Sequence, residues 1–96
     1  MRELVVLPAA LRDIDHQAAY YRDQRSSDTA TRWLERTRRT FEFVSANPAL
    51  GATIGPGLRA WRVEKFKQHI VVYRTLEERV EIVRVLHGAS DLDRLL

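Results

Sequence analysis

The stretch from Leu58 to Gly88 constrains the fold more than any other, because it is dense in residues that form β-strands. Two apolar runs within it, His69–Leu76 and Arg79–Gly88, are rich in Val, Ile and Tyr, which fit a pleated, half-buried surface. Only a short acidic link separates the two runs, so we expect a hairpin there. A weaker and more basic strand precedes them, from Leu58 to Phe66. The stretch therefore predicts three consecutive strands.

The chain before this stretch begins with a pattern typical of a strand followed by a helix. Arg2–Leu7 predicts a short strand, and Pro8 ends it because proline has no backbone N–H to donate. Proline also suits the first turn of a helix, so we expect a helix from Pro8 to near Arg25. Its apolar positions recur at helical spacing on one face: Leu11, Ile14, Ala18 and Tyr21.

A second helix is expected directly after the first. Residues 26–28, Ser-Ser-Asp, supply side chains that cap a helix N-terminus, and Asn47-Pro48 ends the helix near Ala46. Its apolar positions also lie on one face: Ala30, Trp33, Leu34, Thr37, Phe41 and Val44. Because the link between the helices is so short, they should form an antiparallel helical hairpin.

The remaining segments are expected to be irregular. Residues 48–57 hold three of the four glycines and two of the three prolines, so this segment is interpreted as a loop. The tail after Gly88 predicts one helical turn with Ser90 as its cap.

These elements predict an α+β fold in one domain that spans residues 1–96. The order is strand, helix, helix and three strands, with an antiparallel sheet of three to four strands packed on the N-terminal helical hairpin. The other face of the sheet is expected to be open or covered by a partner.

The composition limits the cellular compartments and the classes of partner that fit this chain. The chain has no cysteine, and its N-terminal apolar run is too short for a signal peptide or a membrane span, so we expect a cytoplasmic protein that does not bind membranes. Lys and Arg total 16 against 13 Asp and Glu, a net charge of +3. That excess fits either a well-solvated surface or a basic face for an acidic protein or a nucleic acid.

His87 is the strongest candidate for chemistry, since histidine titrates near neutral pH and this one ends the last strand. The alternative is a polar residue that ends a strand and bonds to the backbone. His16 and His69 are expected to be structural. The spacing of the three histidines matches no metal motif, so neither a metal nor another cofactor is predicted.

Basic and aromatic residues alternate around the first strand of the Leu58–Gly88 stretch. The cations are Arg59, Arg62, Lys65 and Lys67, and the aromatics are Trp61 and Phe66. Such a mixture can bind single-stranded RNA, or the aromatics can belong to the core while the cations protect a solvated edge. On the second helix, Arg36, Arg38 and Arg39 are interpreted as the solvent face.

Taken in order, several short motifs resemble the ParE branch of the RelE/ParE toxin superfamily. They include residues 10–14 (Ala-Leu-Arg-Asp-Ile), Asn47-Pro48 with Gly51, and Leu58-Arg59. They continue with residues 70–74 (Ile-Val-Val-Tyr-Arg), and with residues 82–88 (Ile-Val-Arg-Val-Leu-His-Gly) followed by Asp91. The resemblance implies the strand–helix–helix–three-strand fold and a toxin of a type II toxin–antitoxin system.

The resemblance also implies partners. ParE-like toxins are neutralised by a ParD-like antitoxin, commonly a ribbon-helix-helix protein, in a hetero-oligomer, and they act on DNA gyrase to block replication and growth. RelE-like relatives instead cut mRNA on the ribosome. A third possibility is a toxin fold kept only as a binding module.

The chemistry favours the ParE-like alternative without catalytic residues. RNA cleavage needs a base, an acid and cations around the phosphate, and only His87, Arg62 and Arg74 are candidates. Glu64 stands where a cation would help, and the tail lacks a Tyr or His. The expected contacts with the antitoxin or another partner are Trp33, Arg59, Trp61, Arg62, Phe66 and Tyr73.

Overall fold

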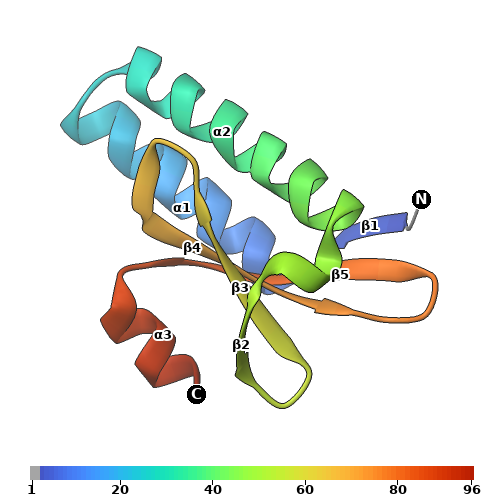
Figure 1. Ribbon diagram of the computed structural model, residues 1–96. Coiled ribbons are helices and arrows are strands. Elements are labelled where there is room, and N and C mark those ends of the chain that lie inside the picture. The colour runs from blue at the N-terminus through green and yellow to red at the C-terminus, as the bar shows by residue number, and fades with distance from the viewer. Residues whose placement is uncertain (1–2) are drawn as a thin grey trace.

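The computed structural model describes residues 3–96, which form one five-stranded sheet with helices on both faces (Figure 1). The elements follow the chain as β1 (Glu3–Val6), α1 (Pro8–Gln24), α2 (Ser27–Ala46), the short 3₁₀ helix η1 (Pro48–Leu50), β2 (Ala52–Gly55), β3 (Leu58–Val63), β4 (Phe66–Thr75), β5 (Arg79–His87) and α3 (Ala89–Leu95). The predicted α+β class and the helical hairpin are confirmed. Arg2, where the first strand was predicted to start, lies outside the described residues.

The sheet is built around the β4–β5 hairpin, as the Leu58–Gly88 stretch predicts. The strand order is β1-β5-β4-β3-β2, and Val71 lies opposite Val85 in the central antiparallel pair. Two details differ from the prediction. β1 pairs with β5 in parallel, and the segment predicted as a loop contains β2. This fifth strand is only four residues long and lies in a segment rich in glycine and proline, so its pairing with β3 accounts for it.

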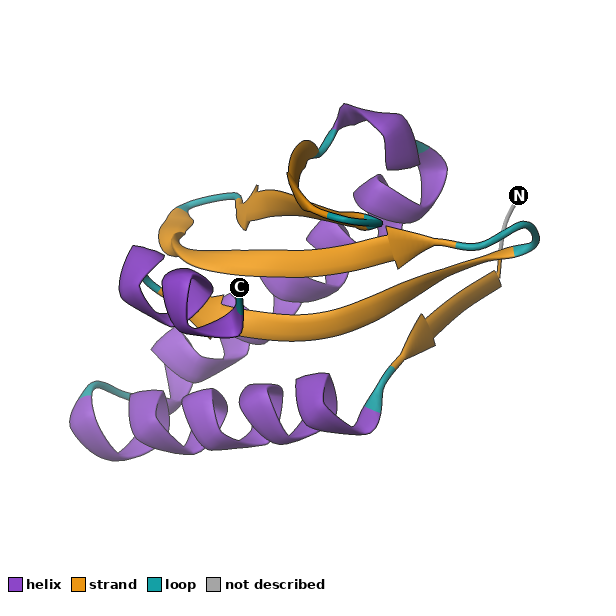
Figure 2. Cartoon of the chain, turned by 90° about the horizontal axis from the view of Figure 1, so that it is seen from below, coloured by secondary structure: helices purple, strands orange, loops and turns teal. Residues whose placement is uncertain are grey.

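Alternation along β4 sends side chains to two separate apolar clusters. Val71 and Tyr73 face the helical hairpin and join the main core, whereas Ile70 and Val72 face the opposite way. Leu92 and Leu95 of α3 pack on the second cluster, so α3 covers part of the face that was predicted to be open or covered by a partner (Figures 1 and 2).

The first helix starts at Pro8 as predicted, but its buried face is turned slightly from the expected one. Ala10 is fully buried, whereas Leu11 is 50% exposed. In the second helix Trp33, Phe41 and Val44 are buried as predicted, and Leu34 is exposed. Each predicted stripe therefore includes one leucine that is exposed, and the stripe of α1 lacks the buried Ala10.

Asp13 joins α1 to the sheet where β1 ends. The Leu7 N–H, just after the end of β1, donates to the Ile82 carbonyl of β5 at 3.0 Å. Further along β5, the Asp13 carboxylate accepts from the Val85 N–H at 2.9 Å and from Arg84 Nε at 2.7 Å. A side chain thus takes the place of a strand along β5.

Ser26 caps α2, as the sequence predicts, and its hydroxyl accepts a hydrogen bond from the Thr29 N–H at 3.0 Å. A helix follows Gly88 as predicted, but its predicted cap, Ser90, was wrong. Gly88, with φ of 88°, precedes α3, and Ser90 lies inside the helix, which has no side-chain cap bond. Within the described residues, no helix is long and apolar enough to cross a membrane.

Replacing Ser26 with alanine should destabilise the protein by about 1 kcal/mol, because the Thr29 N–H loses its acceptor. Urea denaturation of the two proteins measures the difference. Ser27→Ala is the matched control, since Ser27 is also exposed but lies one residue inside the helix. Equal losses in both variants would show that the cap contributes nothing.

Candidate functional site

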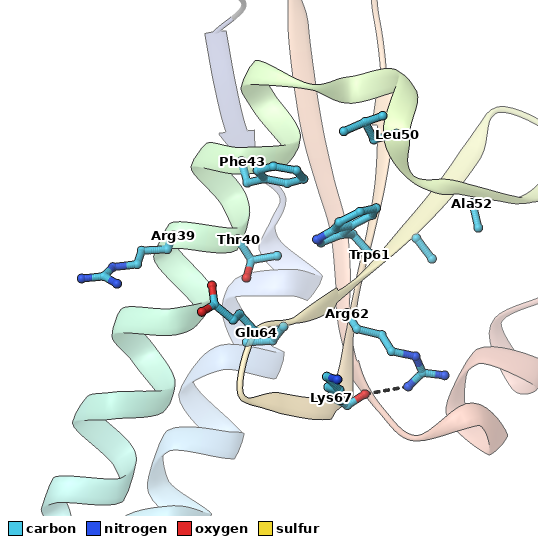
Figure 3. A pocket seen from close by; sticks show the side chains of 11 residues that line it. Arg39, Thr40, Phe43, Leu50, Ala52, Trp61, Arg62, Glu64 and Lys67 are labelled. Carbon is cyan, nitrogen blue, oxygen red and sulfur yellow. Dashed lines mark hydrogen bonds between the residues drawn. The ribbon is translucent and has the colours of Figure 1, made fainter.

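An apolar groove lies between the C-terminal half of α2 and the outer edge of β3 (Figure 3). Its volume is about 850 Å³. Its lining is mostly apolar: Phe43, Leu50, Ala52, Ala60, Trp61 and Val63, with Arg39, Thr40, Arg62, Glu64 and Lys67 around them. Among the groove residues, Leu50 and Phe43 are 58% and 38% exposed, so the groove offers apolar surface to a partner.

The groove exists because β2 covers only half of β3. Ala52 pairs with Ala60, and pairing continues toward Leu58 but not toward Val63. Before Ala52 the chain turns away through Gly51 into η1. Ala60, Trp61 and Val63 all line the groove, although Ala60 packs in the second cluster and the other two in the main one. Lining residues from both faces indicate a groove at the edge of the sheet.

Two aromatic rings form the centre of the groove. The rings of Phe43 and Trp61 lie 5.1 Å apart between centroids, at 31° to each other, and Figure 3 shows Leu50 on the same side. Trp61 was predicted as a contact residue, and it is half-buried beside this surface. Phe43 and Leu50 were missed. Phe43 could have been noticed, because an aromatic residue off the buried stripe of α2 marks exposed apolar surface.

Charges at the end of the groove are mostly positive. Arg62 and Lys67 are exposed, and Arg62 Nη1 donates to the Lys67 carbonyl at 2.6 Å across the β3–β4 turn (Figure 3). The acidic side chain here, Glu64, pairs with Arg36 of α2 at 3.2 Å. Arg39 points away from the rings in Figure 3 and pairs with Glu35. Among the expected partner contacts, Arg62 is therefore placed on an accessible surface.

Hydrogen bonds from side chains of the sheet fix residues 48–51, which form one wall of the groove. The Tyr73 hydroxyl donates to the Pro48 carbonyl at 2.8 Å and accepts from the Gly51 N–H at 3.0 Å. Arg59 Nη1 donates to the carbonyls of Ala49 and Gly51 at 3.2 and 2.7 Å. Burial is the main cause that raises the pKa of Tyr73, which keeps its hydroxyl protonated as a donor. Tyr73 and Arg59, both expected to touch a partner, hold this segment in place.

Three of the expected contact residues are largely or wholly internal. Trp33 and Tyr73 are 0% exposed, so a partner cannot reach them while the core is intact. Phe66 is half-buried against the main core. The prediction rested on residue type, and large aromatics are also the side chains whose burial releases the most apolar surface.

His69 and His87 face each other across the central hairpin, with ring centroids 4.8 Å apart. His69 is 1% exposed and its Nε2 is hydrogen-bonded to the Tyr21 hydroxyl at 2.7 Å, which agrees with a structural role. Burial, together with the nearby His87, lowers the pKa of His69 to about 4. His87 is exposed at the end of β5, and its backbone N–H donates to Asp91 at 3.3 Å.

The three residues considered for RNA cleavage do not come together. Arg74 lies five residues along β4 from His69, about 17 Å at the usual rise, where it pairs with Glu81 at 2.6 Å. Arg62 is opposite Ile70 and so projects to the face of the second cluster. His87 is opposite His69 and projects to the helical face. Within residues 3–96, no group of three or more His, Asp or Glu side chains is suited to a metal ion.

Comparisons with known proteins agree with this fold. A chain described as "Chromosomal ParDE TA system from P. aeruginosa" superposes with a TM-score of 0.80 at 19% identity, over 92% of this chain and 97% of that one. At that identity the likeness shows the fold. Among curated proteins, none matches significantly. A family model, described as the ParE toxin of the type II toxin–antitoxin system parDE, matches residues 4–92. The chain therefore belongs to the ParE toxin family of type II toxin–antitoxin systems.

Proposed function

We propose that this chain is a toxin that blocks replication by binding DNA gyrase and that a ParD-like antitoxin neutralises it in a cytoplasmic hetero-oligomer. The observation that carries the proposal is the match of residues 4–92 to the ParE toxin family. We expect the antitoxin to be a ribbon-helix-helix protein encoded beside the toxin.

The geometry supports binding over cleavage as the mode of action. His87, Arg62 and Arg74 are distributed over two faces and both ends of the central strands, whereas RNA cleavage needs a base and cations around one phosphate. Arg74 is also engaged by the buried Glu81, which Arg79 contacts from its other side. The apolar groove, by contrast, is a surface suited to a protein segment.

A supercoiling assay with purified toxin and gyrase tests the target. We expect loss of supercoiling and accumulation of cleaved DNA complexes, both reversed by the antitoxin. His87→Ala is the control variant, because His87 is exposed and the proposed activity does not use it. Full supercoiling at a large excess of folded toxin would contradict the proposal.

Primer extension on translated mRNA tests the endonuclease alternative in the same preparations. Under the proposal, induction of the toxin without its antitoxin arrests growth and produces no new mRNA ends. Cuts that appear with the wild type and vanish in His87→Ala would favour an mRNA endonuclease instead.

A further inference from the structure

A second cavity, of about 380 Å³, lies between α2 and the turn that joins β3 to β4. We call it the cationic cleft. Among the described residues its lining is almost entirely polar, with four cations and one carboxylate: Thr31, Arg32, Glu35, Arg36, Arg39, Lys65 and Phe66. Because cations outnumber carboxylates so strongly, the cleft attracts an anionic ligand.

Two of the cations carry charge that no carboxylate offsets. Each carboxylate at the cleft is already held by arginine: Glu64 by Arg36 at 3.2 Å, and Glu35 by Arg38 at 2.7 Å and Arg39 at 3.2 Å. Within residues 3–96, Arg32 and Lys65 form no ion pair, and both are exposed. Arg32 makes only a long hydrogen bond, at 3.4 Å, to the Thr29 hydroxyl. Both charges are therefore free to meet a ligand.

The backbone at Lys65 is strained. Its φ of 69° lies in the left-handed region, which glycine and asparagine adopt more readily than lysine does. Lys65 is the second residue of the two-residue turn between Val63 and Phe66, a position where glycine is the common choice. A charged side chain kept at an unfavourable backbone position is a sign that its charge has a function.

The arginines of the cleft form a row along α2. Arg32, Arg36 and Arg39 are four and three residues apart, so they share one side of the helix. The row extends about 10 Å along the helix axis at the usual rise, and one strand of DNA presents about three phosphates over that length. Arg36 and Arg39 each bond to their carboxylate through one nitrogen, which leaves other guanidinium N–H groups as donors.

The opposite end of the sheet is acidic. The two ends are joined by β4, which has ten residues and so extends about 30 Å. At its far end, the turn that joins β4 to β5 gathers Glu3, Glu77 and Glu78 around Arg79 (Figure 1). Such a separation of charge orients the protein toward a polyanion with the cationic cleft in front and the acidic end away.

We propose that the cationic cleft binds the phosphate backbone of duplex DNA, so that the toxin holds the DNA on which gyrase acts. The arginine row contacts successive phosphates of one strand, and Lys65 contacts the backbone from the other side of the cleft. The role of gyrase in this inference rests on the proposed function, whereas the affinity for DNA does not. A toxin that binds gyrase and its DNA together gains strength from both contacts.

The lining of the cleft favours duplex DNA over an acidic protein or a single-stranded RNA. Protein interfaces have an apolar centre with aromatic anchors, and single strands stack their bases on accessible aromatic rings. The aromatic residue of the cleft, Phe66, is half-buried and packs on the main core, with its ring 6.0 Å from that of Tyr21. Interfaces with duplex DNA are polar and strongly positive, as this cleft is.

Fluorescence anisotropy with a labelled duplex tests the cleft in the absence of gyrase. In the double variant Arg32→Gln, Lys65→Asn we expect binding at low salt to weaken about tenfold. The slope of log K against log salt concentration should fall by about two, one for each lost phosphate contact. Arg12→Gln with Arg94→Gln is the matched control, since it removes the same charge at exposed positions on α1 and α3. Equal weakening in both double variants would overturn the proposal.

Lys65→Asn alone separates the charge from the stability of the fold. Asparagine adopts a positive φ with less strain, so the urea midpoint should be unchanged or higher while the affinity for the duplex falls. Lys65→Arg keeps the charge and should bind the duplex as the wild type does. If Lys65→Asn binds as tightly as the wild type, Lys65 does not contact the DNA and the proposal is wrong.

A supercoiling assay with the same variants connects the cleft to the proposed function. The Arg32, Lys65 variant should inhibit gyrase only at about tenfold higher concentration, and the Arg12, Arg94 variant should match the wild type. If the wild type inhibits gyrase but does not bind the duplex through the cleft, the cleft proposal is wrong and the proposed function stands. If the duplex binds as expected and gyrase keeps full activity, the proposed function is wrong and the cleft stands. Tighter binding of a single-stranded RNA than of the duplex would overturn the assignment to DNA.

Discussion

Replacing Gly51 with alanine should destabilise the protein by roughly 3 kcal/mol or more, the cost of an overpacked buried site together with lost hydrogen bonds. A Cβ atom at this position would lie 2.2 Å from the Tyr73 hydroxyl and 2.8 Å from its ring carbon Cζ. Tyr73 is fully buried, so its ring has little room to move aside. Urea denaturation of the two proteins measures the loss.

Gly55→Ala is the matched control for this prediction. Its Cβ would meet only the Cδ2 atom of Leu96 at 3.3 Å, and Leu96 is 60% exposed, so the change should cost less than about 1 kcal/mol. Tyr73→Phe alone should cost about 2 kcal/mol, because the Gly51 N–H and the Pro48 carbonyl lose their partner. Equal losses for the two glycine variants would refute the steric argument.

The stability of the fold should fall by roughly 3 kcal/mol as the pH drops from about 6.5 to about 4, through His69 alone. Burial and the neighbouring His87 lower the pKa of folded His69 to about 4, against 6.5 when unperturbed. Between these values the unfolded chain binds a proton that the folded chain does not. Acid therefore favours unfolding within this window, and the contribution is fully present above pH 6.5.

The His69→Gln variant separates this contribution from the carboxylates, which also titrate on acidification. Glutamine carries no titrating group, and its amide can still bond to the Tyr21 hydroxyl that His69 contacts. Chemical denaturation at several pH values should give a flatter curve for His69→Gln between pH 6.5 and 4, whatever its absolute stability. His16→Gln, at an exposed position on α1, should keep the wild-type curve. If the His69→Gln curve is as steep as the wild type, the buried neutral state of His69 is disproved.

The parts of the fold that could be predicted are those whose signals are local. The β4–β5 hairpin follows from two apolar runs with a short polar link, and α2 follows from a cap at Ser26 and a stop at Asn47-Pro48. β2 was not predicted, because it is only four residues long, lies among glycines and prolines that predict a loop, and acquires its conformation by pairing with residues 58–60. The parallel pairing of β1 with β5 likewise depends on partners more than 70 residues apart in the chain.

The groove was harder to predict than the fold. Trp61 and Arg62 were recognised from an alternation of basic and aromatic residues, but Leu50 and Phe43 become neighbours of Trp61 only when the chain turns at Gly51. Trp33 and Tyr73, in contrast, were predicted to contact a partner but are fully buried. Residue type alone does not distinguish an aromatic that binds a partner from one that fills the core, and the two differ in which face of their element is covered.

Tyr73 anchors the segment from Pro48 to Gly51, and this anchoring affects how tightly the groove can bind a partner. Leu50 lies between the two backbone groups that the buried hydroxyl holds, so this wall of the groove is already ordered before a partner arrives. A preorganised wall spares the complex the conformational entropy that a mobile loop would lose on binding. The affinity for a partner in this groove would then depend on the Tyr73 side chain, which is buried and which that partner does not touch.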